Sequence, residues 1–190
     1  MTKLNRTSLL VWSLALLAPL AAHAESIESE SVELIGHFNF SHTSADIDGG
    51  GDFNVTFVDL KAGLGYFLNS NWEVLGQLLI DQREYDEQSL DYFGLLASAY
   101  YHFAVTGTII PFAGVGLGFV SNGGDGPDET SVIVPELAAG IRWPFAQVAS
   151  FNFSAGYRHR TNAWGVEDAS GHDFFFGAGF SLFLQGGPRR

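Results

Sequence analysis

Segments in which apolar and polar residues alternate recur along most of this chain, and they restrict its fold more than any other feature. Eight such segments follow one another from Ser31 onward, separated by clusters of Gly, Asn, Asp and Ser that are typical of turns. A strand of about 9 to 11 residues is enough to cross a bilayer, and each segment reaches that length. We predict strands at 31–42, 53–67, 72–83, 91–103, 109–121, 131–143, 150–161 and 172–184.

The two faces of these strands differ in charge. One face is apolar or small throughout, as in Val32, Leu34, Gly36, Phe38 and Phe40, and it contains no Asp, Glu, Lys or Arg. The opposite face carries ten charged residues among small ones: Glu33, Asp59, Lys61, Glu73, Asp81, Arg83, Glu136, Arg142, Arg158 and Arg160. A membrane barrel turns its apolar face to lipid, whereas a soluble barrel turns that face inward, and the alternation alone fits both.

Two properties of the charged face favour the membrane arrangement. Its glycines relieve crowding in a barrel of eight strands, whose interior has room only for side chains that fill it. Its five acidic residues match its five basic residues, so they can satisfy one another as a buried network. We therefore predict an all-β fold, an eight-stranded antiparallel transmembrane β-barrel with these ten residues as a lumen charge network.

The predicted connections alternate between uncharged and acidic. Those at 69–71, 104–108 and 144–149 carry no charge, whereas those at 43–52, 84–91, 122–130 and 162–173 hold 13 acidic residues. Outer-membrane barrels have short periplasmic turns and longer outer loops, so we assign the acidic connections to the outside. An aromatic belt is expected at the periplasmic side, formed by Tyr66, Phe67, Trp72, Phe103, Trp143, Phe145 and Phe151.

The N-terminus has the plan of a secretory signal peptide. Lys3 and Arg6 precede an apolar stretch that ends at a small-residue cleavage site, Ala22-His23-Ala24. The stretch is too short to remain as a membrane helix. We predict a signal peptide at 1–24 and one domain, an outer-membrane β-barrel, at 25–190.

Charge and cysteine content narrow the function classes. Without the signal peptide the chain has seven basic and 21 acidic residues, a formal charge of −14, which argues against a nucleic-acid partner. It has no cysteine, so an exported fold must be held by its backbone ladder and packing. The expected partners are outer-membrane lipid and lipopolysaccharide, with an extracellular ligand at the acidic loops. We expect no cofactor, and a monomer because a closed barrel has no free edge.

This pattern, together with the closing strand Phe174–Leu184, resembles the small outer-membrane β-barrel family that includes opacity-type and OmpA-type eight-stranded barrels. The resemblance covers the chain after the signal peptide and implies a location in the bacterial outer membrane. It implies no single function, because such barrels host adhesion, structural and enzymatic roles on one scaffold. The family's closing strand usually ends the chain, whereas here Gln185 to Arg190 follow it.

One short stretch resembles an enzyme motif. His159, Thr161 and Asn162 are similar to the His-x-Ser-Asn motif of the lipid A 3-O-deacylases, which are outer-membrane barrels. The resemblance implies His159 as base, Thr161 as nucleophile and Asp173 as the acid that orients the histidine. Thr replaces the family's Ser, Asp replaces its Glu, and Asp173 falls on the inward face. We favour the alternative that His159 and Thr161 are interfacial residues at a strand end.

Three further patterns are weaker. Asp46 to Asp52 is similar to the start of a calcium loop but lacks the later acidic ligand, so we expect a solvated loop and no metal site. The inward charges favour a salt-bridge plug over a narrow ion channel. The other four histidines of the predicted domain lack ligand-like spacing and are expected to be interior or interfacial: His37, His42, His102 and His172.

The leading hypothesis is a non-enzymatic barrel with a structural or surface-interaction role, and the alternatives are a lipid A acyl-ester hydrolase and a narrow ion channel.

Overall fold

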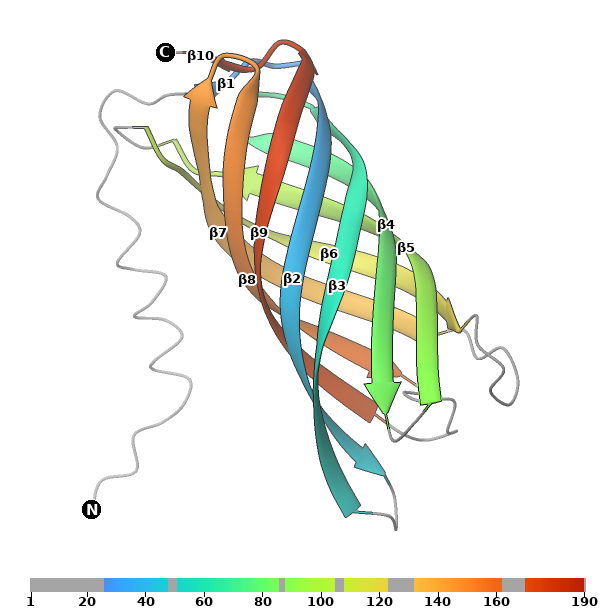
Figure 1. The fold of residues 1–190 in the computed structure, drawn as a ribbon. Coiled ribbons are helices and arrows are strands. Elements are labelled where there is room, and N and C mark those ends of the chain that lie inside the picture. The colour runs from blue at the N-terminus through green and yellow to red at the C-terminus, as the bar shows by residue number, and fades with distance from the viewer. Residues whose placement is uncertain are drawn as a thin grey trace, which may run out of the picture.

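The computed structural model describes residues 26–47, 51–85, 88–104, 108–122, 132–161 and 170–189. These residues form ten strands (Figure 1): β1 (Ser26–Ile27), β2 (Val32–Ile47), β3 (Gly51–Phe67), β4 (Trp72–Tyr85), β5 (Gln88–His102), β6 (Ile110–Asn122), β7 (Val132–Ala146), β8 (Ala149–Thr161), β9 (Ser170–Gln185) and β10 (Pro188–Arg189). In this part of the chain no helix is long and apolar enough to cross a membrane.

Strands β2 to β9 form a closed barrel in sequence order. Each pairs antiparallel with the next, and β2 closes the ring by pairing antiparallel with β9. The predicted eight-stranded antiparallel barrel is therefore confirmed. The predicted signal peptide, 1–24, lies outside the described residues.

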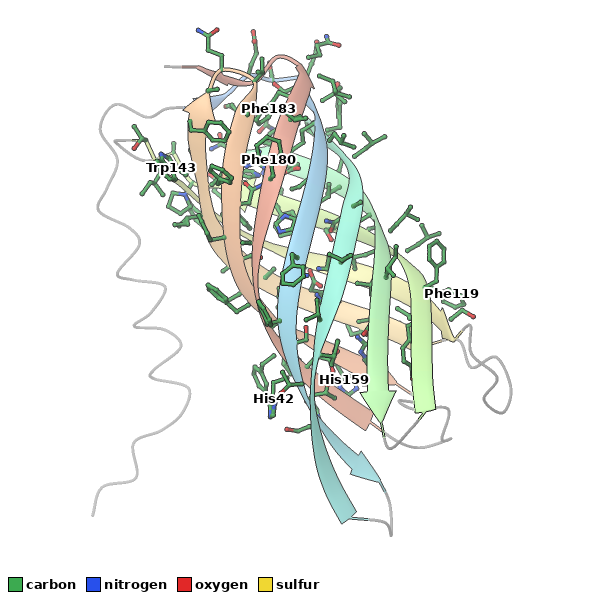
Figure 2. All side chains as sticks on the ribbon, in the orientation of Figure 1. His42, Phe119, Trp143, His159, Phe180 and Phe183 are labelled. Atoms are coloured by element: carbon green, nitrogen blue, oxygen red, sulfur yellow. The ribbon has the colours of Figure 1, made fainter. Side chains whose placement is uncertain are left out.

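The side chains of the barrel alternate between a buried interior and an exposed outer wall (Figure 2). On β5, Leu95 is 61% exposed, whereas Leu96 beside it is 4% exposed. The exposed positions are the apolar ones of the sequence pattern, and the buried positions include its charged ones. Because successive residues of a strand point to opposite faces, a shift of one residue would reverse this arrangement throughout the strand.

Several strands run further than the hydrophobic pattern predicts. The first hairpin continues to Ile47 and resumes at Gly51, where a connection at 43–52 is expected. Likewise β4 ends at Tyr85, β5 begins at Gln88 and β9 begins at Ser170. Backbone pairing continues past the last apolar residues because the ladder needs no apolar side chain. The rest of the predicted outer loops, including 48–50 of the calcium-like stretch, lies outside the described residues.

The short segment before the first barrel strand in the sequence pairs with the short segment after the last one. Strand β1 pairs antiparallel with β10, and the Ser31 hydroxyl accepts a hydrogen bond from the Gly187 amide at 3.0 Å. Ile27 of β1 belongs to a buried cluster with Phe67, Ile110 and Phe183. We call β1, β10 and this cluster the terminal cap.

The position of Phe67 in the terminal cap shows that one prediction was wrong. Phe67 is expected in an outward aromatic belt, but it is 0% exposed and lies inside the barrel in a cluster with Ile27. It follows Tyr66, which is outward and exposed, so the alternation of β3 places Phe67 inward. Trp72 and Trp143, also expected in the belt, are outward and exposed.

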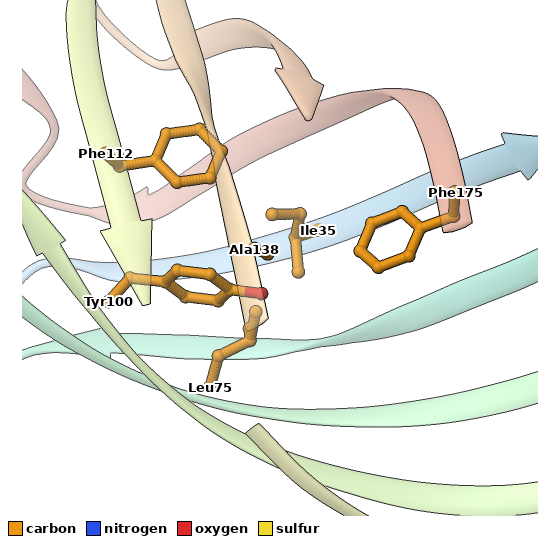
Figure 3. Close-up of a cluster of buried hydrophobic side chains, with 6 residues drawn as sticks. All are labelled: Ile35, Leu75, Tyr100, Phe112, Ala138 and Phe175. Carbon is orange, nitrogen blue, oxygen red and sulfur yellow. The ribbon is translucent and has the colours of Figure 1, made fainter. Parts of the chain in front are cut away.

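A second apolar cluster lies deeper in the barrel interior (Figure 3). It consists of Ile35, Leu75, Tyr100, Phe112, Ala138 and Phe175. The rings of Tyr100 and Phe112 meet edge to face with centroids 5.5 Å apart, a favourable geometry for aromatic pairs. The interior is thus filled by aromatic and aliphatic side chains between its charged groups.

Candidate functional site

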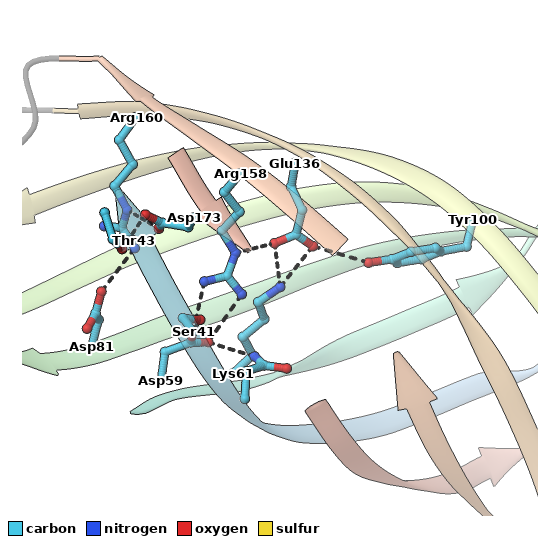
Figure 4. A network of polar contacts seen from close by, with 11 residues as sticks. Ser41, Thr43, Asp59, Lys61, Asp81, Tyr100, Glu136, Arg158, Arg160 and Asp173 are labelled. Carbon is cyan, nitrogen blue, oxygen red and sulfur yellow. Dashed lines mark hydrogen bonds and ion pairs between the residues drawn. The ribbon is translucent and has the colours of Figure 1, made fainter. Parts of the chain in front are cut away.

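The barrel interior holds a central cluster of four ionised groups (Figure 4). Arg158 of β8 donates to Asp59 of β3 at 2.8 and 3.2 Å and to Glu136 of β7 at 2.7 Å. Lys61 of β3 donates to both oxygens of Glu136, at 2.6 and 2.9 Å. All four residues are buried. Two cations therefore balance two carboxylates across the barrel.

Neutral groups complete the central cluster. The Asn39 amide and the Ser41 hydroxyl donate to the two oxygens of Asp59, at 2.6 and 2.7 Å. The Tyr100 hydroxyl lies 3.5 Å from an oxygen of Glu136. These donors use further lone pairs of the carboxylates, which a buried ion pair needs if its desolvation cost is to be offset.

A close backbone approach makes room for this cluster. A Cβ on Gly156 would collide with the Leu137 carbonyl oxygen and with the Phe175 ring, so no larger residue fits without a shift of its neighbours. The Phe175 ring in turn lies 4.3 Å from the Arg158 guanidinium, within the range of a cation–π contact. Gly156 thus lets an aromatic ring support the central cation.

A second cluster lies toward the ends of β8 and β9 that carry the longer connections. Arg160 donates to Asp173 at 2.5 Å and to Asp81 at 3.0 Å. The Thr43 hydroxyl donates to the other oxygen of Asp173 at 2.6 Å. Both carboxylates are buried, so one guanidinium joins three strands inside the barrel.

A third cluster lies next to the terminal cap. One nitrogen of Arg142 lies 2.9 Å from Glu33 and 3.5 Å from Glu73, and its Nε donates to the Asn152 side-chain oxygen at 3.0 Å. Nε2 of His102 lies 2.8 Å from the same oxygen of Glu73. This cluster joins strands β2, β4, β5, β7 and β8.

The clusters leave little free space between them. An interior cavity of about 20 Å³ is lined by residues of the central cluster and of the third cluster, among them Lys61, Glu73, Glu136 and Arg142. A single water molecule needs about 10 to 15 Å³, so this cavity has room for one water and no larger solute.

The structure places nine of the ten residues of the predicted lumen network inside the barrel, each in one of these clusters. The side chain of the tenth, Arg83, lies outside the described part. The clusters also include residues that the prediction leaves out: Asn39, Ser41, Thr43, Tyr100, His102, Asn152 and Asp173. All of them lie on the inward face of their strands, so counting polar residues on that face would have found them.

Two described residues of the enzyme-like motif, His159 and Asp173, lie on opposite faces of the barrel wall. His159 lies on the outer wall and pairs in register with His172, with ring centroids 5.1 Å apart. Asp173 lies inside the barrel with Arg160. The side chain of Thr161 lies outside the described part. Within the described residues, no group of three or more His, Cys, Asp or Glu side chains is arranged to hold a metal ion.

Comparisons with known proteins agree with this architecture. The Neisserial surface protein A structure superposes with a TM-score of 0.57 at 16% identity, covering 78% of this chain and 96% of that one. The outer membrane protein OprG from Pseudomonas aeruginosa superposes with a TM-score of 0.53 at 12% identity, covering 86% and 100%. No curated protein matches the sequence.

The family comparison covers most of the chain. The profile of the family described as outer membrane protein beta-barrel domain matches residues 10–184. The strand order and the apolar outer wall are those of such a domain. The chain therefore belongs to the outer membrane protein beta-barrel domain family and is a protein of the bacterial outer membrane.

Proposed function

We propose that this protein is a non-enzymatic outer-membrane barrel with a structural or surface-interaction role and a lumen closed to ions. One observation supports the closed lumen: the central cluster joins β3, β7 and β8 across the interior. Its members are Asp59, Lys61, Glu136 and Arg158. A barrel of eight strands leaves an interior just wide enough for side chains to fill, and these side chains fill it.

The side chains that fill the interior argue against the ion-channel alternative. A conducting pore needs a continuous path of water through the barrel. Arg158 contacts carboxylates on two other strands, and the cavity beside the central cluster has a volume of about 20 Å³. An ion would have to displace this hydrogen-bonded cation to pass.

The geometry also argues against the hydrolase alternative. A His base in an acyl-ester hydrolase is oriented by an acid that bonds its second nitrogen. The acid assigned by resemblance, Asp173, faces the interior, where it bonds to Thr43 and Arg160. His159 on the outer wall lies beside His172 instead.

Electrical recording tests the closed lumen. Purified barrel inserted in a planar bilayer should give no steady current, whereas Arg158→Ala, which removes the side chain across the lumen, should raise the conductance. A steady current through the wild-type barrel that grows with salt concentration and changes in Arg158→Ala would identify a channel and overturn the proposal.

Mass spectrometry of lipid A tests the non-enzymatic role. Cells that express the wild-type barrel should contain the same lipid A as cells that express His159→Ala at an equal level of assembled protein. Loss of one acyl chain with the wild-type barrel alone would make the protein a hydrolase.

Deletion of an acidic connection tests the surface-interaction role. Removal of residues 123–130 should leave assembly intact while reducing the binding of cells to an extracellular ligand, because loops carry binding residues on a scaffold that folds without them. If the shortened chain failed to reach the outer membrane, the connection would be needed for assembly of the barrel and the surface-interaction role would lose this support.

A further inference from the structure

The described histidines divide between the two faces of the barrel wall. His37 lines the interior cavity, and His102 contacts Glu73 inside the barrel. The other three, His42, His159 and His172, lie on the outer wall of β2, β8 and β9. These strands are consecutive around the closed barrel, so all three outward histidines gather on one side.

Contacts join His159, His172 and Tyr157 in a small polar surface, and His42 lies one strand further along the wall. The His159 and His172 rings lie 5.1 Å apart on paired residues of β8 and β9. The Tyr157 hydroxyl lies 2.5 Å from Nδ1 of His172, and the two rings are stacked. His42 pairs in register with Phe174, two residues along β9 from His172. We call His42, Tyr157, His159 and His172 the outer histidine patch.

The patch lies at one edge of the apolar wall. Along β2, His42 is eight residues beyond Leu34, and along β8, His159 is eight residues beyond Phe151. At about 3.4 Å per residue and a tilt of about 40°, each histidine lies about 21 Å further along the barrel axis, close to the height of an apolar band of about 25 Å. Figure 2 shows His42 and His159 toward the end of the barrel opposite Trp143 and Phe183.

The patch offers hydrogen-bond donors where lipid headgroups lie. When the Tyr157 hydroxyl donates to Nδ1 of His172, the proton of that imidazole is on Nε2 and can be donated to a ligand. None of the described side chains on the outer wall of β2, β8 and β9 is an Asp or Glu, which would repel an anion. Phe174 beside the patch is 60% exposed and offers an apolar surface to acyl chains.

From this placement we propose that the outer histidine patch binds the phosphate group of an outer-leaflet glycolipid of the lipid A class. The Nε2–H of His172 and the imidazole of His159 donate to phosphate oxygens, and each forms a charge-assisted hydrogen bond. The acyl chains pack beside them on Phe174. The inference depends on the lipid-facing wall and is independent of whether the lumen is closed, so the two proposals can fail separately.

NMR of the histidine side chains tests the proposal. The predicted domain contains five histidines, so selective labelling gives five signals, and the inward His37 and His102 serve as internal controls. The barrel is held in maltoside micelles, which contain no phosphate. It is titrated with bisphosphorylated lipid A, with lipid A stripped of its phosphates, and with inorganic phosphate.

Lipid A should shift the signals of His159 and His172, and neither control ligand should do so. Tyr157→Phe removes the hydroxyl that keeps the proton of His172 on Nε2. It should weaken lipid A binding about ten-fold, because the hydrogen bond from that Nε2–H to the charged phosphate is weakened. Tyr101→Phe changes an outward tyrosine at the other edge of the wall and should leave the affinity within about two-fold, as expected for a residue without phosphate contact.

Three results would overturn the proposal. Equal shifts with stripped lipid A would show acyl contact without phosphate recognition. Equal shifts with inorganic phosphate would show a site for free anions. Equal binding by wild type and by the double variant His159→Gln with His172→Gln would show that the patch takes no part.

Discussion

Removal of the Arg158 side chain should destabilise the barrel strongly. Arg158 is 1% exposed and makes three hydrogen bonds to Asp59 and Glu136. The variant Arg158→Met leaves these two buried carboxylates facing a single cation, Lys61. Breaking a buried ion pair by removing one partner costs about 3 to 5 kcal/mol, so the free energy of unfolding should fall by about that amount.

A second variant separates lost charge balance from lost packing. Arg158→Met combined with Asp59→Asn leaves one carboxylate, Glu136, against one cation, Lys61. The Asn side chain keeps one oxygen that can accept the hydrogen bond of Asn39, and its amide nitrogen can donate to the Ser41 hydroxyl oxygen in place of the second bond. The double variant should therefore recover at least about 2 kcal/mol of the loss, since no charge of the central cluster is left without a partner.

Urea-induced unfolding in phospholipid vesicles, followed by tryptophan fluorescence, measures both variants against the wild-type barrel. The reasoning predicts the order wild type, double variant, single variant in unfolding free energy. An unfolding free energy of the single variant within about 1 kcal/mol of that of wild type would refute the reasoning, because an unpaired buried charge should destabilise the barrel by more than that. A double variant no more stable than the single one would refute the role of charge balance.

The other predictions concern the terminal cap, the side-chain packing around Gly156 and the lipid-facing outer wall. The same unfolding measurement checks each of them. Ile27→Ala should cost about 2 to 5 kcal/mol, while Ile109→Ala, at an exposed residue, should cost far less; equal losses would deny the terminal cap a packing role. Gly156→Ala should cost about 1 to 3 kcal/mol through overpacking, and Gly76→Ala, where a Cβ meets nothing within 4 Å, should be tolerated. Leu95→Arg, on the outer wall, should cost about 2 to 4 kcal/mol in a bilayer, and no loss there would mean that this position does not face lipid.

The alternation of apolar and polar residues predicts eight strands, each with one apolar face and one charged face. The glycines and the balanced charges of the charged face are what predict that it points inward, and Asp59 and Lys61 do lie on the inward face of β3. The partner of each charge could not be predicted. Arg158 meets Asp59 across 99 residues of sequence, and only the closure of the ring brings the two together.

The terminal cap shows a second limit of the sequence pattern. Strands β1 and β10 have two residues each, too few to show any periodicity. Their pairing depends on the closed barrel, which brings the start and the end of the strand region to the same edge. The enzyme-like motif shows that residues close in the sequence need not meet in the fold. His159 and Asp173 are near in sequence but point to opposite faces of the barrel wall.

Spin labels along one strand test the central claim most directly, that the apolar face of the barrel meets lipid. The chain has no cysteine, so single cysteines at Phe93, Leu95, Ala97, Ala99 and Tyr101 of β5 each give one label. In bilayers, access of oxygen relative to a water-soluble nickel reagent should be highest at Ala97 and should fall toward both ends. Nickel access that is equally high at all five positions would place this face in water and contradict the account.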